Sequence, residues 1–288
     1  MRKTATRSNA FFVGRHPEAT SERQAQVMSW SERRVDEASL VGVRQRSGQT
    51  PPVVLLHGFT QTGRSWGPVV ERLDSRVEIF TPDAPGHGSS TESRLGIAEY
   101  ADVLATSLPP AVYVGYSMGG RTALHVALRH PGAVLALVLI GATAGLDDET
   151  ERKERRRRDD ELASRIETFD LDHFLTEWLS QPLFESLPRE KWNLDDRRRN
   201  TTAGLAHSLR MAGTGVQRSL WSRLPEIECA TTLVTGAEDR KFSLLAERMA
   251  SLLGGSVNRV EVPGRGHAVH LEDPDAVAAI IGRARSTV

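Results

Sequence analysis

Short apolar runs alternate with helical patterns along most of this chain of 288 residues. Runs without a polar face are typical of parallel strands that helices cover on both sides. The alternation therefore predicts an α/β fold with a mostly parallel central sheet and helices on both of its faces. The expected strands are 53–56, 77–80, 111–114, 135–140, 232–234 and 259–262. The expected helices are about 65–73, 96–108, 118–130, 244–253 and 274–285.

The alternation is interrupted once. From residue 145 to about residue 225 the pattern is helical and rich in arginine, and it contains no convincing strand. We interpret residues 145–225 as a helical lid that is inserted between two parts of one core, 31–144 and 226–288. Residues 1–30 are polar without a periodic apolar face, so we expect a poorly ordered N-terminal extension there.

Charge and cysteine content exclude several classes of function. Lys plus Arg and Asp plus Glu both number 37, so no overall field favours nucleic acid or an anionic membrane. Cys229 is the only cysteine, which rules out an intramolecular disulfide and fits a reducing compartment. No apolar run approaches the roughly 18 residues that span a bilayer. We expect a cytoplasmic protein with a small-molecule substrate, no nucleic-acid partner and no membrane span. The oligomeric state stays open, and a monomer is compatible with the sequence.

A Gly-Tyr-Ser-Met-Gly motif at residues 115–119 lies between an expected strand and an expected helix. A sharp strand-to-helix turn needs small neighbours, and it presents its central side chain at a helix N-terminus that stabilises negative charge. A serine in a glycine-rich turn is often only a turn residue. The strand before it and the helix after it favour Ser117 as a reactive hydroxyl.

Two further residues follow expected strands and complete a pattern. Asp239 and His267 come after later strands, in the chain order Ser, Asp, His that is typical of α/β-hydrolases. Because the carboxyl ends of parallel strands meet at one edge of a sheet, Ser117, Asp239 and His267 are expected to form a catalytic triad. Glu238 is an alternative acid if the loop shifts by one residue.

The turn after the first apolar strand predicts an oxyanion hole. His-Gly-Phe follows directly at residues 57–59, and the backbone N–H groups of Phe59 and Met118 are the expected donors. His87 is expected to serve turn chemistry and His270 to be a satisfied loop histidine. Neither has the spacing of a metal ligand, so we expect no metal and no cofactor.

Residues 50–288 resemble the α/β-hydrolase superfamily, and within it the family of 2-succinyl-6-hydroxy-2,4-cyclohexadiene-1-carboxylate synthases of menaquinone biosynthesis. The superfamily resemblance rests on residues 56–59, 82–88, 115–119 and 266–267. The narrower resemblance rests on Arg121 one helical turn after Ser117, and on residues 145–159, 174–184, 208–210 and 236–242.

The narrower resemblance implies a lyase that eliminates pyruvate from 2-succinyl-5-enolpyruvyl-6-hydroxy-3-cyclohexene-1-carboxylate. The triad would then act as a general base, and arginines would orient the carboxylates of the substrate. The alternatives are a solvated helix face for Arg155 and a purely structural place in the lid for Trp178. The implied substrate-binding residues are His57, Tyr116, Arg121, Arg155, Trp178 and Arg210.

Two other functions compete with the lyase. An ester or carbon–carbon bond hydrolase would use Ser117 as a covalent nucleophile, and an apolar pocket without convergent arginines would favour it. A non-catalytic receptor on the same fold is disfavoured by the complete set of Ser117, Asp239 and His267, because a receptor has no use for an oriented general base.

Overall fold

The computed structural model describes residues 31–35, 38–44 and 49–288, and the extension expected at 1–30 lies outside these residues. Within them, an eight-stranded sheet has the order β1-β2-β4-β3-β5-β6-β7-β8. Strands β3 to β8 are parallel, whereas β1 and β2 join them antiparallel. The strands are β1 (Ser31–Val35), β2 (Ala38–Arg44), β3 (Gln49–Leu56), β4 (Val77–Phe80), β5 (Ala111–Tyr116), β6 (Val134–Ile140), β7 (Ala230–Gly236) and β8 (Val257–Val262).

The expected fold class is confirmed, and each expected strand is present in this sheet. The two strands that the sequence analysis did not predict are β1 and β2. Their sequences mix charged and apolar residues, and among the described strands β1 lies at the edge of the sheet beside β2. Antiparallel and edge strands tolerate such mixed sequences because one face or edge stays near water.

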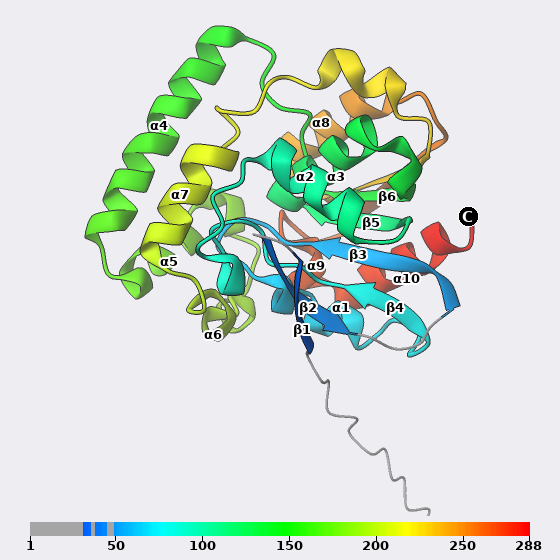
Figure 1. The fold of residues 1–288 in the computed structure, drawn as a ribbon. Helices are drawn as coiled ribbons and strands as arrows, with labels where there is room; N and C mark the ends of the chain where they lie inside the picture. The colour runs from blue at the N-terminus through cyan, green and yellow to red at the C-terminus, as the bar shows by residue number, and fades with distance from the viewer. Residues whose placement is uncertain (1–30, 36–37, 45–48) are drawn as a thin grey trace, which may run out of the picture.

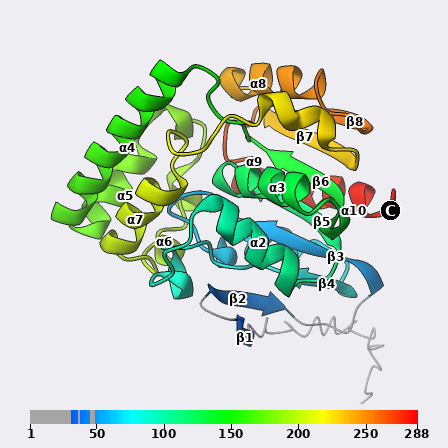
Figure 2. The same cartoon turned by 45° about the horizontal axis from the view of Figure 1, so that its top comes forward.

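Helices cover both faces of the sheet (Figure 2). Alternate residues of β3 face opposite ways: Val54 and Leu56 belong to one apolar core, and Val53 and Leu55 to the other. The first core lies under α2, α3 and α8, and the second under α1 and α10. These helices are α1 (Gly67–Val70), α2 (Ile97–Ser107), α3 (Met118–Arg129), α8 (Arg240–Ala250) and α10 (Pro274–Arg285).

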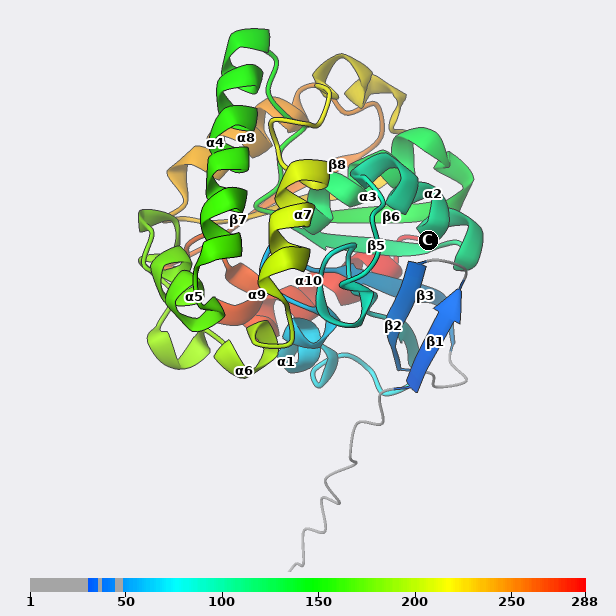
Figure 3. The ribbon, with the colours of Figure 1, turned by 60° about the vertical axis from the view of Figure 1, so that its left-hand side comes forward.

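Four helices lie between β6 and β7 in the chain and stand at the carboxyl ends of the strands (Figure 1). Of these inserted helices, α4 and α7 pack side by side (Figure 3). They share a small apolar core that includes Ile166, Phe174 and Leu205. The inserted helices are α4 (Glu149–Thr168), α5 (Leu171–Leu179), α6 (Leu194–Arg197) and α7 (Thr202–Ala212).

Two helix boundaries differ from the expectation. The first helix is short, because a 3-10 turn at Gly63–Trp66 precedes α1. Helix α8 begins at Arg240 and not near residue 244, since the Asp239 side chain caps it by accepting a hydrogen bond from the Phe242 N–H. Among the described residues, no helix combines the length and the apolar composition that a membrane crossing needs.

Candidate active site

Ser117 lies at a strained turn between β5 and α3. Its φ of 50° and ψ of −104° fall outside the regions that L-residues usually occupy, and its N–H donates to Ile140 O at 2.9 Å. A Cβ on Gly115 would lie 2.4 Å from the oxygen of Gly119, and one on Gly119 would lie 2.1 Å from Leu56 O. The turn therefore requires both glycines of the motif.

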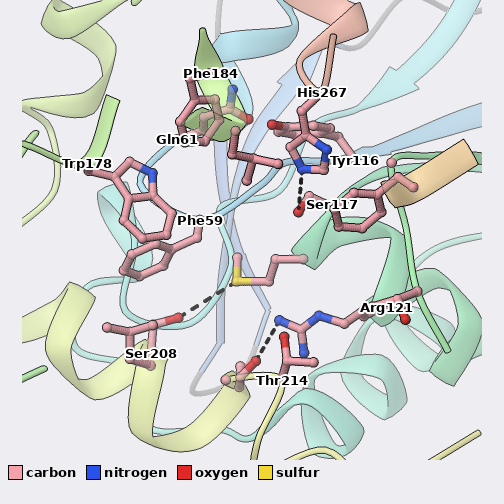
Figure 4. A pocket seen from close by; sticks show the side chains of 18 of the residues that line it. Phe59, Gln61, Tyr116, Ser117, Arg121, Trp178, Phe184, Ser208, Thr214 and His267 are labelled. Carbon is pink, nitrogen blue, oxygen red and sulfur yellow. Dashed lines mark hydrogen bonds between the residues drawn. The ribbon is translucent and has the colours of Figure 1, made fainter. Parts of the chain in front are cut away.

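Ser117, His267 and Asp239 are brought together by the ends of β5, β8 and β7. His267 Nε2 lies 3.3 Å from Ser117 Oγ (Figure 4). On the other side of the ring, His267 Nδ1 lies 2.6 Å from Asp239 Oδ2. The carboxylate can only accept, so Nδ1 carries the proton and Nε2 is free to accept from the serine hydroxyl. Glu238, the alternative acid, is exposed and is not bonded to His267.

Aromatic rings enclose the imidazole of His267. The ring centroids of Phe242, Tyr116 and Phe184 lie 4.4, 5.3 and 6.2 Å from that of His267. These contacts, together with the carboxylate of Asp239, fix the orientation of the imidazole.

The loop after β3 places the backbone N–H group of Phe59 beside the same cavity as Ser117. Gly58 N–H is engaged by Gln61 Oε1 at 3.1 Å. The N–H groups of Phe59 and Met118 have no acceptor among the residues that the structure describes. Met118 begins α3, so its N–H is one of the donors that a helix N-terminus leaves unpaired.

A cavity of about 150 Å³ opens over Ser117 between the sheet and the inserted helices (Figure 4). Phe59, Trp178 and Phe184 form an aromatic part of its wall. None of the described residues that line it is acidic, although Asp239 lies behind His267. Its basic lining residues are Arg121, Arg155, Arg197 and Lys241.

Arg121 is buried, and uncharged groups hold its guanidinium. Nη1 donates to Gln217 Oε1 at 3.0 Å, and Nη2 donates to Ala212 O at 2.8 Å. Burial lowers the pKa of Arg121 to about 10, so the group still carries its charge at neutral pH. Arg121 therefore brings a buried positive charge to the cavity without a carboxylate among its hydrogen-bond partners.

Arg197 is a second buried cation of this kind, which the sequence analysis missed. Its guanidinium donates to Trp192 O at 2.7 Å and to Thr60 Oγ1, and burial lowers its pKa to about 10. Thr60 itself has a φ of 68° in the loop that also carries Phe59. Arg197 stands in a run of three arginines that reads as a solvated face, so no signal in the sequence distinguished it.

The other two basic lining residues are more accessible. Arg155 donates through Nε to Asp159 Oδ1 at 2.7 Å and still lines the cavity. Lys241 was not singled out either, although it follows Asp239 by two residues in a segment that carries the resemblance. Its ammonium lies 5.7 Å from the centroid of the Phe242 ring.

Arg210 lies outside this cavity, contrary to the expectation that it binds substrate. Its guanidinium is bonded to Glu167 and Asp160 of α4, at 2.5 and 3.0 Å. Ser208 and Ala212 line the cavity from the same helix. Residue 210 is two positions from each, about 200° around an α-helix, so it points the opposite way.

His57 is likewise not among the cavity's lining residues, whereas Tyr116, Arg121, Arg155 and Trp178 are. His57 Nε2 accepts from Ala84 N at 2.9 Å and Nδ1 donates to Gly58 O at 2.8 Å. Burial lowers the pKa of His57, which keeps it neutral. The geometry gives it a structural place beneath the loop.

Comparison with known proteins agrees with this geometry. The model of the alpha/beta hydrolase family matches residues 53–280. A Bacillus subtilis (strain 168) protein named for 2-succinyl-6-hydroxy-2,4-cyclohexadiene-1-carboxylate synthase activity is 39% identical over 247 residues, 80% of this chain and 88% of the relative. The synthase of Enterobacter sp. (strain 638) is 31% identical over 241 residues, 81% of this chain and 91% of that protein.

A solved structure shows the same similarity. MenH from S. aureus superposes with a TM-score of 0.77 at 29% identity, covering 83% of this chain and 96% of that chain. The chain thus belongs to the alpha/beta hydrolase family and, within it, to the 2-succinyl-6-hydroxy-2,4-cyclohexadiene-1-carboxylate synthases.

Proposed function

We propose that this protein is the lyase that eliminates pyruvate from 2-succinyl-5-enolpyruvyl-6-hydroxy-3-cyclohexene-1-carboxylate, a step of menaquinone biosynthesis. The observation that carries the proposal is a cavity whose described lining includes four basic residues and no acidic one, directly over the serine of a Ser-His-Asp arrangement. The substrate bears ring, succinyl and enolpyruvyl carboxylates, which such a cavity suits. The similarity to named synthases supports the same reaction.

Substrate carboxylates would be bound by Arg121, Arg155, Arg197 and Lys241. Arg121 and Arg197 are already desolvated and held by uncharged groups, so binding an anion costs them little further desolvation or ordering. Planar guanidinium groups also orient carboxylates through paired hydrogen bonds. The cations would thereby hold the ring in one orientation above Ser117.

The triad would remove a proton from the ring. Asp239 holds His267 in the tautomer whose Nε2 accepts the hydroxyl proton of Ser117. The serine oxygen then takes the proton from ring carbon 2, which lies next to the succinyl ketone and is acidified by it. Ser117 acts here as a base and forms no bond to carbon.

The electrons of the broken C–H bond follow the double bonds. They form the bond between carbons 2 and 3, the former 3,4 double bond moves to carbons 4 and 5, and the bond from carbon 5 to the enolpyruvyl oxygen breaks. The leaving enolate takes up a proton and becomes pyruvate. During this step the ketone oxygen gains negative charge, and the N–H groups of Phe59 and Met118 would stabilise it by about 3–4 kcal/mol each.

We propose that the inserted helices, within residues 145–225, act as a lid over the ring. Trp178 packs edge-on against Phe59 with ring centroids 5.1 Å apart, and Phe184 lies 6.0 Å from Trp178. This aromatic wall would exclude water, which strengthens the ion pairs inside. A hydrolase would instead need an ordered water, and the basic lining favours the lyase over a small-ester hydrolase.

The proposed reaction also implies where the protein acts and what kind of substrate it binds. A small-molecule polycarboxylate substrate and a cytoplasmic place of action are part of the proposal, and the bacterial synthases that the chain matches support it.

The test is to incubate the purified protein with the enolpyruvyl substrate and to follow both the ultraviolet absorbance of the conjugated diene and the release of pyruvate. We expect both products in equal amounts. A parallel reaction with p-nitrophenyl acetate reports ester hydrolysis. Rapid ester hydrolysis without any pyruvate release would overturn the proposal in favour of a hydrolase.

A further inference from the structure

Glu272 holds the backbone on both sides of His267. It ends the short helix α9 (Val269–Glu272), and its side chain is buried. Oε2 accepts from the N–H of Gly266 at 2.8 Å, and Oε1 accepts from the N–H of Ala268 at 3.0 Å. A buried carboxylate is costly unless it is hydrogen-bonded, and both oxygens of Glu272 are bonded to the residues that flank His267.

Other groups orient the imidazole of His267 but do not fix the position of the backbone that carries it. Asp239 and the surrounding aromatic rings orient the ring itself. A backbone hydrogen bond of 2.9 Å from Glu238 N to Arg265 O ties the start of the His267 loop to the loop of Asp239. Glu272 is the side chain that anchors the two peptide groups next to His267. Those anchors set where Nε2 lies relative to Ser117 Oγ.

We propose that Glu272 is a positioning residue for the elimination: its carboxylate clamps the His267 loop so that Nε2 stays within reach of the Ser117 hydroxyl. Glu272 does not line the cavity, and therefore it acts only through His267. The kinetic part of this inference rests on the proposed function. Because the basic lining residues are untouched, loss of the clamp affects the proton transfer and leaves substrate binding in place.

The variants are Glu272→Gln, which keeps the shape but turns an NH2 group toward one of the two N–H donors, and Glu272→Ala, which removes both acceptors. The matched control is Asp273→Asn, one residue on, with the same change of charge. Asp273 Oδ1 caps α10 by accepting from Ala276 N at 3.0 Å, and asparagine caps equally well. The Oδ2 of Asp273 also lies 3.4 Å from Arg265 Nε, so the control reports what a charge lost near the start of the His267 loop does while the two peptide groups beside His267 keep their acceptors. Circular dichroism and thermal unfolding show whether each variant is folded, and the Gln variant decides if the Ala variant is not.

We expect kcat of Glu272→Gln to fall about 10- to 100-fold, since a misplacement of 1 Å costs on the order of 10²-fold. KM should stay within about twofold, and Asp273→Asn should keep both constants within about twofold. An unchanged kcat in Glu272→Gln, a rise of KM alone, or an equal loss in Asp273→Asn would overturn the assignment.

A second measurement needs no substrate. We expect the proton between His267 Nδ1 and Asp239 to give a strongly deshielded ¹H NMR signal, because that hydrogen bond is 2.6 Å long. The signal should be present in the wild type and in Asp273→Asn and lost or broadened in Glu272→Gln. Its retention would overturn the inference. If instead the wild type releases no pyruvate, the proposed function fails while this signal still decides the role of Glu272.

Discussion

The basic residues of this protein differ in their surroundings, and that difference decides which of them can bind a substrate. Arg157 is exposed and paired with Glu154 and Glu161, an arrangement worth roughly 0–1 kcal/mol. Arg121 is buried with only uncharged partners. An incoming carboxylate displaces nothing from Arg121 but would have to compete with the acids around Arg157.

Removing Arg121 should therefore cripple turnover of the polycarboxylate. We expect Arg121→Ala to lower kcat/KM by roughly 30-fold to several thousandfold, since an unpaired buried carboxylate costs on the order of 2–5 kcal/mol. Arg210→Ala is the matched control, because Arg210 is bonded to acids outside the cavity. It should change kcat/KM by less than about threefold. Equal losses in the two variants would mean that Arg121 acts only structurally.

Ser117 and His267 should fail as a unit. Ser117→Ala and His267→Ala each remove one end of a single proton transfer, so each is expected to lower kcat by more than about 10³-fold. The double variant should be hardly slower than either single one. Steady-state kinetics with the enolpyruvyl substrate measure this, and fully multiplicative losses would contradict a shared transfer.

We expect the burial of His87 to lower the free energy of unfolding in acid. His87 is fully buried, accepts from Thr60 N at 3.3 Å, and has a pKa lowered to about 3 by burial. Between its ordinary pKa and about 3 the unfolded chain binds a proton that the folded chain does not, so the free energy of unfolding decreases as the pH falls through this range. The contribution of His87 is a loss of about 2 kcal/mol from about pH 7.5 to about pH 5.

Urea unfolding at these two pH values measures this loss. The variant His87→Gln cannot titrate there, so its decrease in unfolding free energy should be smaller than that of the wild type by about 2 kcal/mol. The buried His57 and His270 have pKa values lowered by burial as well, but they are present in both proteins and cancel. The same decrease in wild type and variant would show that His87 is protonated in the folded state.

At the scale of elements, α7 is held against the core by a close backbone approach. A Cβ on Gly204 of α7 would lie 2.4 Å from Gly86 O and 2.5 Å from Thr91 Oγ1, in the loop after β4. Through this contact the core fixes where α7 places Ser208 and Ala212 in the cavity wall. The inserted helices therefore depend on a glycine for their position.

Gly204→Ala should therefore destabilise the protein, although alanine favours helix formation more than glycine does. At an open helical site, replacing glycine by alanine stabilises by about 0.5–1 kcal/mol. Gly282 in α10 is such a site, because an added Cβ would meet no described atom within 4 Å beyond its chain neighbours and the backbone of its own helix. We expect Tm to rise in Gly282→Ala and to fall in Gly204→Ala, and KM to rise only in the latter. Differential scanning calorimetry measures Tm, and a rise in both variants would refute the close contact.

The sequence predicts elements well where burial is uniform. Strands β3, β5 and β6 lie in the parallel part of the sheet, and their buried apolar runs predict them. Strand β8 is a more exposed parallel edge strand, and its alternating valines predict it. Strands β1 and β2 escaped because a mixed sequence suffices at an antiparallel edge. The sequence analysis placed the start of α8 too late, because the apolar periodicity of this helix begins several residues after its N-cap, Asp239. Asp239 was interpreted only as the acid that bonds His267, and the structure shows that it serves both roles.

At the scale of the whole molecule, the order of strand ends brings distant residues to one site, and this part of the site could be predicted. Ser117, Asp239 and His267 each follow a strand, so topology alone places them together. The sequence could not predict which of Arg197 and Arg210 lines the cavity, because that depends on how the inserted helices are rotated over the sheet. Arg210, which was expected to bind substrate, points away from the cavity, whereas Arg197 on the preceding helix α6 is buried beside it.

The whole molecule carries no net charge, yet its cavity is strongly basic. The positive charge that would bind an anionic substrate therefore comes from the basic residues around the cavity above Ser117, and not from the overall charge of the chain. The central claim is that these basic residues hold a substrate from which the Ser117 oxygen takes a proton.

The most direct test is a single-turnover measurement with enzyme in excess and with substrate that carries deuterium at ring carbon 2. Under this condition product release does not contribute to the observed rate of diene formation. We expect deuterium to slow diene and pyruvate formation together, because Ser117 breaks that C–H bond in the elimination step. Identical rates with hydrogen and deuterium would contradict proton abstraction by the triad.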